Sequence, residues 1–508
     1  MRIAMLSWES LNTIAVGGVA AHVSELADAL AEKGHEVHIF TRAGENQPEY
    51  ERIGNVHEHR CRYQYCDNLV DDVNKMCGAI VEQVIATEDH IGPFDVIHAH
   101  DWLAANAMIW LKQQRGRRSI LTIHSTEYGR CGNTFPDGQS ARVREQERAG
   151  LYWCDHVIAV SGVTQAELAG MYDVPIWKTS VVHNGVRNAR FEVTCDPAEE
   201  KERYGIDRMD PTVLFCGRMA YQKGPDLLLE AIPSILKYYD NAKFIFAGDG
   251  DMRWSLEERA RDMGIEHAVR FLGYRNGNEL PRLFKLADMV CVPSRNEPFG
   301  IVVLEAWSAG KPVVVTQIGG PAEYVAHEQT GLKVYPTVDS IAWGLGTMFM
   351  DFDRARRMGK AGLETVQQRF TWDRIAEKTL AVYDPSHVPQ TRDAMQVTEA
   401  IHVNGRRSAS TQRKHRADSS AMSTTNGTRS TSRIDARPEL NPAEDLVATL
   451  QRCRSMLHQV ESILPAPVEN RTYRKTTEST DSRAGRQNGR NKTRRDGTRR
   501  ELASHMKH

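Results

Sequence analysis

Short apolar runs alternate with helix-length amphipathic segments along most of the chain. The run Arg2–Leu6 precedes a loop containing Gly17 and Gly18, an amphipathic segment at 20–33 and a second apolar run at 35–40. This order predicts a βαβ unit. Further strand-like runs lie at 95–98, 119–123, 156–160 and 179–183. Because helix-length segments separate them, they favour a mostly parallel sheet that helices cover on both faces.

A second series of the same kind begins at Pro211. Its apolar runs lie at 213–216, 243–247, 269–272, 289–293, 312–316 and 331–335. Two α/β series joined by a polar stretch, 187–210, predict two Rossmann-like, doubly wound domains that face each other across a cleft. We place the first domain at 1–190 and the second at 191–370. A ligand should bind in the cleft, at the carboxyl ends of the parallel strands.

After Asp384 the composition changes. Residues 385–508 contain one aromatic side chain, Tyr473, and are rich in Ser, Thr, Arg, Asn and Gly. Such a segment buries too little apolar surface to offset its ordering entropy, so we expect a largely disordered basic tail. Within it, residues 443–464 carry apolar side chains at spacings of three and four. This predicts an amphipathic helix, which either docks on the body or mediates self-association.

Charge is distributed unevenly between body and tail. Residues 1–384 carry 42 basic and 53 acidic side chains, a net charge of −11, whereas residues 385–508 carry 23 and 13, a net charge of +10. An acidic body argues against a nucleic-acid enzyme, which needs a clustered basic surface. Nine cysteines without CxxC spacing indicate reduced thiols, and no run of about 18 apolar residues predicts stable membrane insertion. We therefore expect a cytoplasmic protein.

The segment 294–305 holds two glutamates between a predicted strand and a helix expected to start near Phe299. Glu297 lies in the loop and Glu305 lies two turns into the helix. Carboxylates at this spacing can bind sugar hydroxyls, and the free N–H groups of Phe299, Gly300 and Ile301 offer partial positive charge to phosphate. A sugar nucleotide has both features. Alone, the segment would equally suit a helix-capping pattern followed by an exposed glutamate.

Two cations and two glycine pairs strengthen this interpretation. Arg218 and Lys223 follow the first strand of the second domain, where they could neutralise a diphosphate leaving group. Gly319 and Gly320 follow another strand of that domain and, like Gly17 and Gly18 in the first, would let the backbone approach phosphate. Each glycine pair alone is a weak signal.

Two patterns resemble metal sites, and we assign neither. Asp249 and Asp251 spell DxD, but they follow an apolar strand-like run in a Gly-Asp-Gly-Asp sequence, which favours a turn. His98 and His100 place two imidazoles on one side of a strand, yet no third ligand lies nearby in the sequence. We expect no metal cofactor.

The body as a whole resembles the retaining GT-B glycosyltransferases of the glutamate-x7-glutamate group, which includes glycogen synthases. The resemblance covers about residues 1–384. It rests on the ordered combination of Gly17-Gly18, His100-Asp101-Trp102, His183-Asn184-Gly185-Val186, Arg218, Lys223, Glu297 and Glu305.

The resemblance implies a role for each matching residue. It implies that Arg218 and Lys223 bind the donor diphosphate and that Glu305 binds the ribose. Glu297 would lie beside the transferred hexose, and His100 on the acceptor side. It also implies that residues 371–384 form a final helix that returns to the first domain, and that the acceptor attacks from the front face without an enzymic nucleophile.

Donor and acceptor are expectations of the same kind. Similarity to glycogen synthases implies glucose from ADP- or UDP-glucose and an α-glucan acceptor. Other members of the group make exopolysaccharides, glycolipids or small glycosides. Two other classes stay open, because fold alone does not establish function: a catalytically silent nucleotide-sugar sensor and a nucleotide-sugar epimerase.

Overall fold

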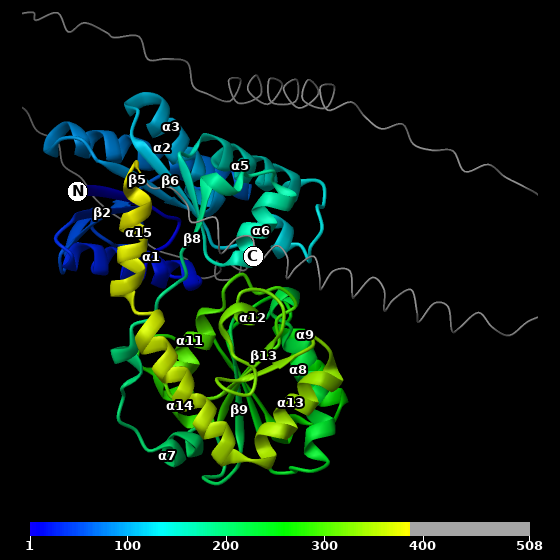
Figure 1. Cartoon of the computed structure of the whole chain (residues 1–508). Coiled ribbons are helices and arrows are strands. Elements are labelled where there is room, and N and C mark those ends of the chain that lie inside the picture. Colours follow the sequence, from blue (N-terminus) through cyan, green and yellow to red (C-terminus); the bar gives the residue numbers. More distant parts are fainter. Residues whose placement is uncertain (387–508) are drawn as a thin grey trace, which may run out of the picture. The chain divides into compact units, whose positions relative to one another are not determined.

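The computed structural model describes residues 1–386 (Figure 1). The predicted tail from residue 387 onward, including the amphipathic helix at 443–464, lies outside the described residues. Two α/β lobes follow each other along the described chain, each built on its own sheet. The predicted fold class is therefore confirmed for this part of the protein. The exact domain limits at 190 and 370 stay predictions.

The first lobe contains an eight-stranded sheet in the order β3-β4-β2-β1-β5-β6-β7-β8. All its neighbouring strands are parallel except β3, which runs antiparallel to β4. Its strands are β1 (Arg2–Leu6), β2 (Glu36–Arg42), β3 (Tyr50–Ile53), β4 (Val56–Cys61), β5 (Val96–His100), β6 (Arg118–Ile123), β7 (His156–Ala159) and β8 (Thr179–Val181). Its helices are α1 (Gly18–Glu32), α2 (Leu69–Ile91), α3 (Asp101–Arg115), α4 (Glu127–Arg130), α5 (Gln139–Trp153) and α6 (Gly162–Met171).

The hairpin β3–β4 is the part of this sheet that the apolar pattern did not predict. Its strands carry polar side chains, and Glu58, His59 and Arg60 are buried although they are ionisable. A search for apolar runs therefore passes over them. The two-residue turn Gly54-Asn55, with Gly54 at a φ of 59°, is the signal that identifies such a hairpin.

The second lobe contains a six-stranded sheet in the order β11-β10-β9-β12-β13-β14, with all neighbours parallel. Its strands are β9 (Thr212–Cys216), β10 (Lys243–Ala247), β11 (Val269–Gly273), β12 (Met289–Val292), β13 (Val313–Thr316) and β14 (Leu332–Val334). Its helices are α7 (Pro197–Glu202), α8 (Pro225–Leu236), α9 (Arg253–Asp262), α10 (Glu279–Leu286), α11 (Ile301–Ser308), α12 (Pro321–Tyr324), α13 (Val338–Met350) and α14 (Phe352–Arg369).

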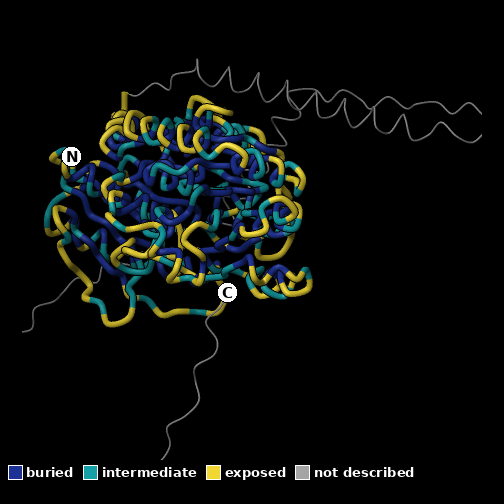
Figure 2. Tube along the Cα trace, turned by 90° about the horizontal axis from the view of Figure 1, so that it is seen from below, coloured by how far each residue is buried: buried dark blue, intermediate teal, exposed yellow. Residues whose placement is uncertain are grey.

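Apolar side chains on both faces explain why these strands read as continuous hydrophobic runs. In β9, Val213 and Phe215 enter the core beneath α8 and α13, whereas Leu214 enters the opposite core beneath α10 and α11. Strand side chains alternate between faces, so a sheet covered on both sides needs apolar residues at every position. Figure 2 shows the buried positions gathered in the interior of the described chain and the exposed ones along outer turns and helix faces.

A final helix, α15 (Trp372–Tyr383), packs against the first lobe beside α1 (Figure 1). Trp372 donates its indole N–H to the buried carboxylate of Glu25 on α1. At the other end, the Tyr383 hydroxyl lies 2.7 Å from Nδ1 of His98 on β5. Ile375 between them is fully buried. The helix thus closes an apolar face of the first lobe and supplies hydrogen bonds to two of its buried polar groups.

We predict that a chain ending at Asp384 keeps its thermal stability and most of its turnover, whereas one ending at Phe370 is unstable or inactive. The shorter chain loses the buried side chains of α15, of which the large apolar ones are each worth about 1.5–3 kcal/mol of burial, and leaves the Glu25 carboxylate without Trp372 and Nδ1 of His98 without Tyr383. Thermal unfolding and turnover of the two chains test this. A well-folded but inactive chain ending at Asp384 would instead assign residues beyond it to the active site.

Three stacked histidines join β2 to β4 at one side of the first sheet. His38 stacks on His57 and His59 with ring centroids 4.4 and 5.2 Å away, and its Nδ1 lies 2.9 Å from Nε2 of His59. Burial lowers the pKa of His38 to about 4 and that of His59 to about 3, and the neighbouring imidazoles contribute. These rings are therefore neutral in the folded protein at neutral pH.

We predict that acid destabilises the protein partly through His59. The pKa of His59 in the folded protein lies below the usual 6.5. The contribution of His59 to the free energy of unfolding is therefore complete above pH 6.5 and is lost as the pH falls towards about 3. At pH 5 the loss is about 2 kcal/mol. In urea unfolding, the stability of His59→Phe relative to wild type should rise by about this amount between pH 7.5 and pH 5. A relative stability that stays constant between these pH values would contradict this.

Candidate active site

Four of the predicted site residues lie in loops at one edge of the six-stranded sheet. Arg218 follows β9, and Lys223 ends the short 3-10 helix Tyr221–Lys223. Glu297 follows β12, and Gly319 follows β13. Because β9, β12 and β13 are adjacent and parallel, their carboxyl ends bring these loops together.

Glu297 is the buried centre of this edge. Only 4% of it is exposed, and Nζ of Lys223 lies 2.8 and 2.9 Å from its two carboxylate oxygens. The Ser294 hydroxyl donates a third hydrogen bond of 2.8 Å to Oε2. A buried carboxylate requires such partners to stay ionised. An ammonium group has three N–H donors, so Lys223 keeps one for a further acceptor.

Two glycines hold the loop that carries Glu297. A Cβ on Gly224, whose φ is 65°, would lie 2.3 Å from the carbonyl oxygen of Pro293. A Cβ on Gly319, whose φ is 78°, would lie 2.0 Å from the carbonyl oxygen of Glu297 itself. The Gly320 N–H donates to that same oxygen over 2.7 Å. From the sequence we expected Gly319 and Gly320 to let the backbone approach phosphate. In the structure, both glycines lie close to the backbone of the loop that carries Glu297.

Arg218 has the freedom that a ligand-binding cation requires. Its side chain is exposed, and its hydrogen bond to Oε1 of Gln222 is long, at 3.5 Å. Lys223 is balanced by Glu297, whereas the guanidinium of Arg218 makes no ion pair within residues 1–386. It can therefore reorient towards an anion at low cost.

The helix after the glutamate loop starts two residues later than predicted. α11 begins at Ile301, with Gly300 at its N-cap in the left-handed region, φ 86°. Phe299 precedes the helix with its side chain buried, and the Tyr324 hydroxyl donates to its carbonyl over 2.8 Å. The N–H groups of the first turn of α11 thus stay at the sheet edge, as an anion site requires.

Glu305, on α11, makes no hydrogen bond or ion pair with Glu297 or Lys223. It lines a small pocket together with Glu25, Arg190 and Trp372. Burial raises the pKa of Glu305 to about 7, with Arg190 opposing the rise and Glu25 adding to it. A half-buried carboxylate with a raised pKa is a good hydrogen-bond partner for a hydroxyl group that enters the pocket.

Gly17 and Gly18 form the start of α1 in the first lobe. The Gly17 N–H donates over 2.9 Å to Oε2 of Glu9, so part of its donor capacity is already used. A Cβ on Gly18 would lie 3.1 Å from Cδ1 of Ile301, the first residue of α11. This glycine turn and the start of α11 thus lie face to face, and Gly18 leaves room for that contact.

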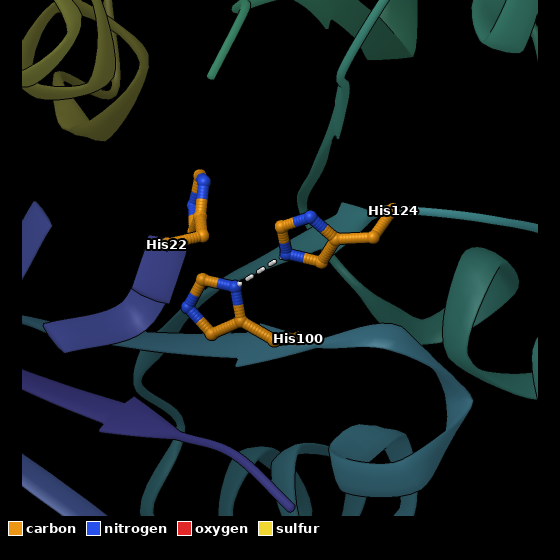
Figure 3. A group of neighbouring side chains, drawn as sticks. All are labelled: His22, His100 and His124. Carbon is orange, nitrogen blue, oxygen red and sulfur yellow. Dashed lines mark hydrogen bonds between the residues drawn. The ribbon is translucent and has the colours of Figure 1, made fainter. Parts of the chain in front are cut away.

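His100 ends β5 and belongs to a buried group of imidazoles (Figure 3). Its Nδ1 lies 3.1 Å from Nε2 of His124, which follows β6, and the ring of His22 on α1 lies edge-on to both. Burial, with the neighbouring imidazoles, lowers the pKa of His22 and His100 well below the usual value. Burial also lowers the pKa of His124 to about 3.

Sequence spacing did not reveal this group. His98 and His100 are close in the sequence and were considered there as possible metal ligands. His22 lies 78 residues before His100, and His124 lies 24 residues after it. Only the sheet order, in which β5 lies between β1 and β6, brings them together. A histidine at the end of one strand and another directly after the next strand were the signal available in the sequence.

Asp101 fixes the backbone beside His124. Its φ of 56° is unusual for a residue with a side chain, and its Oδ1 accepts the His124 N–H over 2.7 Å. Burial raises the pKa of Asp101 to about 6, although the nearby Arg130 opposes the rise. Arg130 in turn pairs with buried Glu147 at 2.7 Å. This charged network orients the loop that carries His124.

The DxD pattern lies in the turn between β10 and α9. The Asp249 carboxylate accepts the Gly250 N–H over 2.9 Å and pairs with Arg253 over 3.3 Å. The Asp249 carboxylate thus stabilises this turn, as the sequence pattern suggested.

Comparison with known proteins identifies the family. The family profile described as Glycosyltransferase Family 4 matches residues 16–190, and the one described as Glycosyl transferases group 1 matches residues 196–365. An uncharacterized glycosyltransferase of Methanocaldococcus jannaschii is 37% identical over 394 residues, which cover 75% of this chain and 98% of the relative. The chain belongs to the family 4 glycosyltransferases.

Other relatives of this glycosyltransferase have different named activities. A glycogen synthase of Mycobacterium tuberculosis is 29% identical, with 75% of this chain and 94% of the relative covered. A D-inositol 3-phosphate glycosyltransferase of Corynebacterium urealyticum is 31% identical, with 75% and 95% covered.

Solved structures share the fold of the glycosyltransferase. Sucrose-phosphate synthase from Thermosynechococcus elongatus aligns with a TM-score of 0.63 and 25% identity, over 75% of this chain and 98% of that one. The catalytic domain of starch synthase IV from Arabidopsis thaliana, bound to ADP and acarbose, aligns with a TM-score of 0.63 and 16% identity, over 75% and 98%. In residues 1–386 of the glycosyltransferase, no helix is both long and apolar enough to cross a membrane.

We predict that Gly319→Ala strongly reduces the activity of the glycosyltransferase. The added methyl group would collide with the Glu297 carbonyl and also strain a backbone at φ 78°, so the glutamate loop must move. A displacement of about 1 Å near a reacting centre costs on the order of 10²-fold in rate. Gly346→Ala is the matched control, because a Cβ there meets nothing within 4 Å in helix α13. Equal turnover in the two variants would contradict this account of the loop.

Proposed function

We propose that this protein is a retaining glycosyltransferase that transfers a hexose from a nucleotide diphosphate sugar to an acceptor hydroxyl group. The observation that carries the proposal is the buried Glu297 carboxylate, paired with Lys223 at the carboxyl edge of the six-stranded sheet. A fixed acidic group for a sugar and a cation for a phosphate thus lie less than 3 Å apart.

The leaving diphosphate would be bound by Arg218 and Lys223. Because the charge of Lys223 is shared with Glu297, the unpaired charge comes from Arg218 and from the N–H groups at the start of α11. Donors of this kind act most strongly on charge that develops as the glycosidic bond breaks. We therefore expect turnover without an added cation.

Retention would follow from front-face attack. In this step the acceptor hydroxyl attacks the anomeric carbon on the side of the departing diphosphate and gives its proton to a diphosphate oxygen as the C–O bond breaks. A covalent intermediate would need a carboxylate under the anomeric carbon. The Glu297 carboxylate already accepts three hydrogen bonds, from Lys223 and Ser294, and these stabilise it as a fixed anion and weaken it as a nucleophile.

We infer glucose from ADP- or UDP-glucose as the donor and an α-glucan as the acceptor. The named glycogen synthase relative supports this choice, and ADP bound to a protein of the same fold supports a nucleoside diphosphate leaving group. A small soluble acceptor is the second candidate, because the named D-inositol 3-phosphate glycosyltransferase is similar at 31% identity. His100, at the strand-end edge of the first lobe, would lie on the acceptor side in either case.

Turnover with defined substrates tests the proposal. ADP-, UDP- and GDP-hexoses are incubated with the full chain, with and without a glucan primer or a small polyol phosphate, and nucleoside diphosphate release is measured. The proposal expects release that depends on an acceptor. A changed hexose without release would identify an epimerase, and binding without either product would identify a sensor.

We predict that Glu305→Gln weakens donor binding while the protein stays folded. If the carboxylate accepts a hydrogen bond from a ribose hydroxyl, its loss costs about 1.5–3 kcal/mol, or roughly 10–100-fold in donor affinity. Much of the kinetic effect should appear in kcat/KM. Glu364→Gln, at an exposed position on α14, is the control. Unchanged donor affinity in Glu305→Gln would remove this residue from the site.

A further inference from the structure

Three imidazoles from separate elements meet at the carboxyl edge of the first sheet: His22 on α1, His100 at the end of β5 and His124 after β6 (Figure 3). One nitrogen of each ring lies within 4.8 Å of the others. Burying polar rings is costly unless their nitrogens have hydrogen-bond partners or bind a ligand.

Their spacing fits a tetrahedral metal ion. At the Zn–N length of 2.0–2.1 Å, two tetrahedral ligand nitrogens lie about 3.3 Å apart and the ring centres about 5 Å apart. Nδ1 of His100 and Nε2 of His124 are 3.1 Å apart. The ring centroids are 4.5 Å apart for His22 and His124, 5.3 Å for His22 and His100, and 5.4 Å for His100 and His124.

An unpaired nitrogen gives an independent indication of a ligand. Nε2 of His22 is buried and has no hydrogen-bond partner, and this residue is only 3% exposed. Nδ1 of His22 lies 2.8 Å from the side-chain oxygen of Asn184, an acceptor. The proton of His22 is therefore on Nδ1, which leaves the lone pair of Nε2 available to a ligand. An outer hydrogen bond of this type is how proteins orient histidine ligands.

We propose that His22, His100 and His124 form a binding site for a divalent transition metal of the zinc class. Three imidazoles without a carboxylate favour Zn²⁺, Ni²⁺ or Cu²⁺ over Mg²⁺ or Ca²⁺. Binding replaces the His100–His124 hydrogen bond, and the ring that donates it moves its proton to its other nitrogen, so that no proton is released. Half-buried His124 provides the approach from solvent.

The expected consequence is inhibition. A metal ion on His100 removes that imidazole from the acceptor side of the cleft, so Zn²⁺ should slow transfer and a chelator should restore it. This consequence rests on the proposed function, whereas metal binding itself does not.

The test is a Zn²⁺ titration of the full chain by calorimetry, without substrate. Wild type should show one tight equivalent above any weak surface binding. Asn184→Ala should weaken this equivalent by about 10–100-fold, as loss of an outer hydrogen bond does elsewhere. His22→Gln and His124→Gln should weaken it further. His57→Gln, in the other histidine stack of the same sheet, is the matched control and should bind as wild type does.

Two results would overturn the site: no tight equivalent in wild type, or a tight equivalent that persists in both His22→Gln and His124→Gln. If the variants do not fold, the Zn K-edge absorption spectrum of the zinc-loaded wild-type protein tests the site instead, because the site requires three imidazole ligands. Tight Zn²⁺ binding in a protein without transferase activity would refute the proposed function and leave the site standing. Acceptor-dependent release of nucleoside diphosphate without tight Zn²⁺ binding would refute the metal site and leave the proposed function standing.

Discussion

The candidate donor site depends on backbone segments that approach one another more closely than side chains allow. The loop from Pro293 to Glu297 lies between Gly224 on one side and Gly319 on the other, and a Cβ at either glycine would overlap a carbonyl oxygen of that loop. These contacts place a buried carboxylate next to the end of β9, where Lys223 reaches it. The ion pair could not form in this position if the loops were separated by ordinary side chains.

The two lobes present chemically different edges to each other. The edge of the six-stranded sheet carries charge: the paired Glu297 and Lys223, and the exposed Arg218. The edge of the eight-stranded sheet carries buried neutral imidazoles, of which His100 is one. Charges held in place on one side suit a leaving group that develops negative charge, while neutral rings suit recognition of an uncharged hydroxyl. This division agrees with transfer from a charged donor to a sugar acceptor.

Much of the architecture could be predicted from the sequence because both sheets are buried on two faces. Runs such as Val213 to Phe215 have no other stable environment, and their order specifies two α/β units. The β3–β4 hairpin could not be found in this way, because its buried residues are polar and are stabilised by long-range contacts such as the His38–His59 hydrogen bond. Its turn, Gly54-Asn55, was the local signal that remained.

The site was predictable where residues are close in the sequence and unpredictable where topology assembles it. Glu297, Lys223 and Arg218 could be placed at one sheet edge from strand order alone. The histidine group could not, because His22 reaches His100 only through the position of α1 on the folded sheet. The role of Gly319 was likewise hidden, since its contact is with the glutamate loop and depends on the packing of neighbouring strand ends.

The most direct test of the central claim is a crystal structure of the full chain with a nucleoside diphosphate. The account predicts that the diphosphate lies at the carboxyl edge of the six-stranded sheet, within hydrogen-bond distance of Arg218 and Lys223 and beside the first turn of α11. A nucleotide bound to the eight-stranded sheet, or a diphosphate that contacts neither cation, would contradict it.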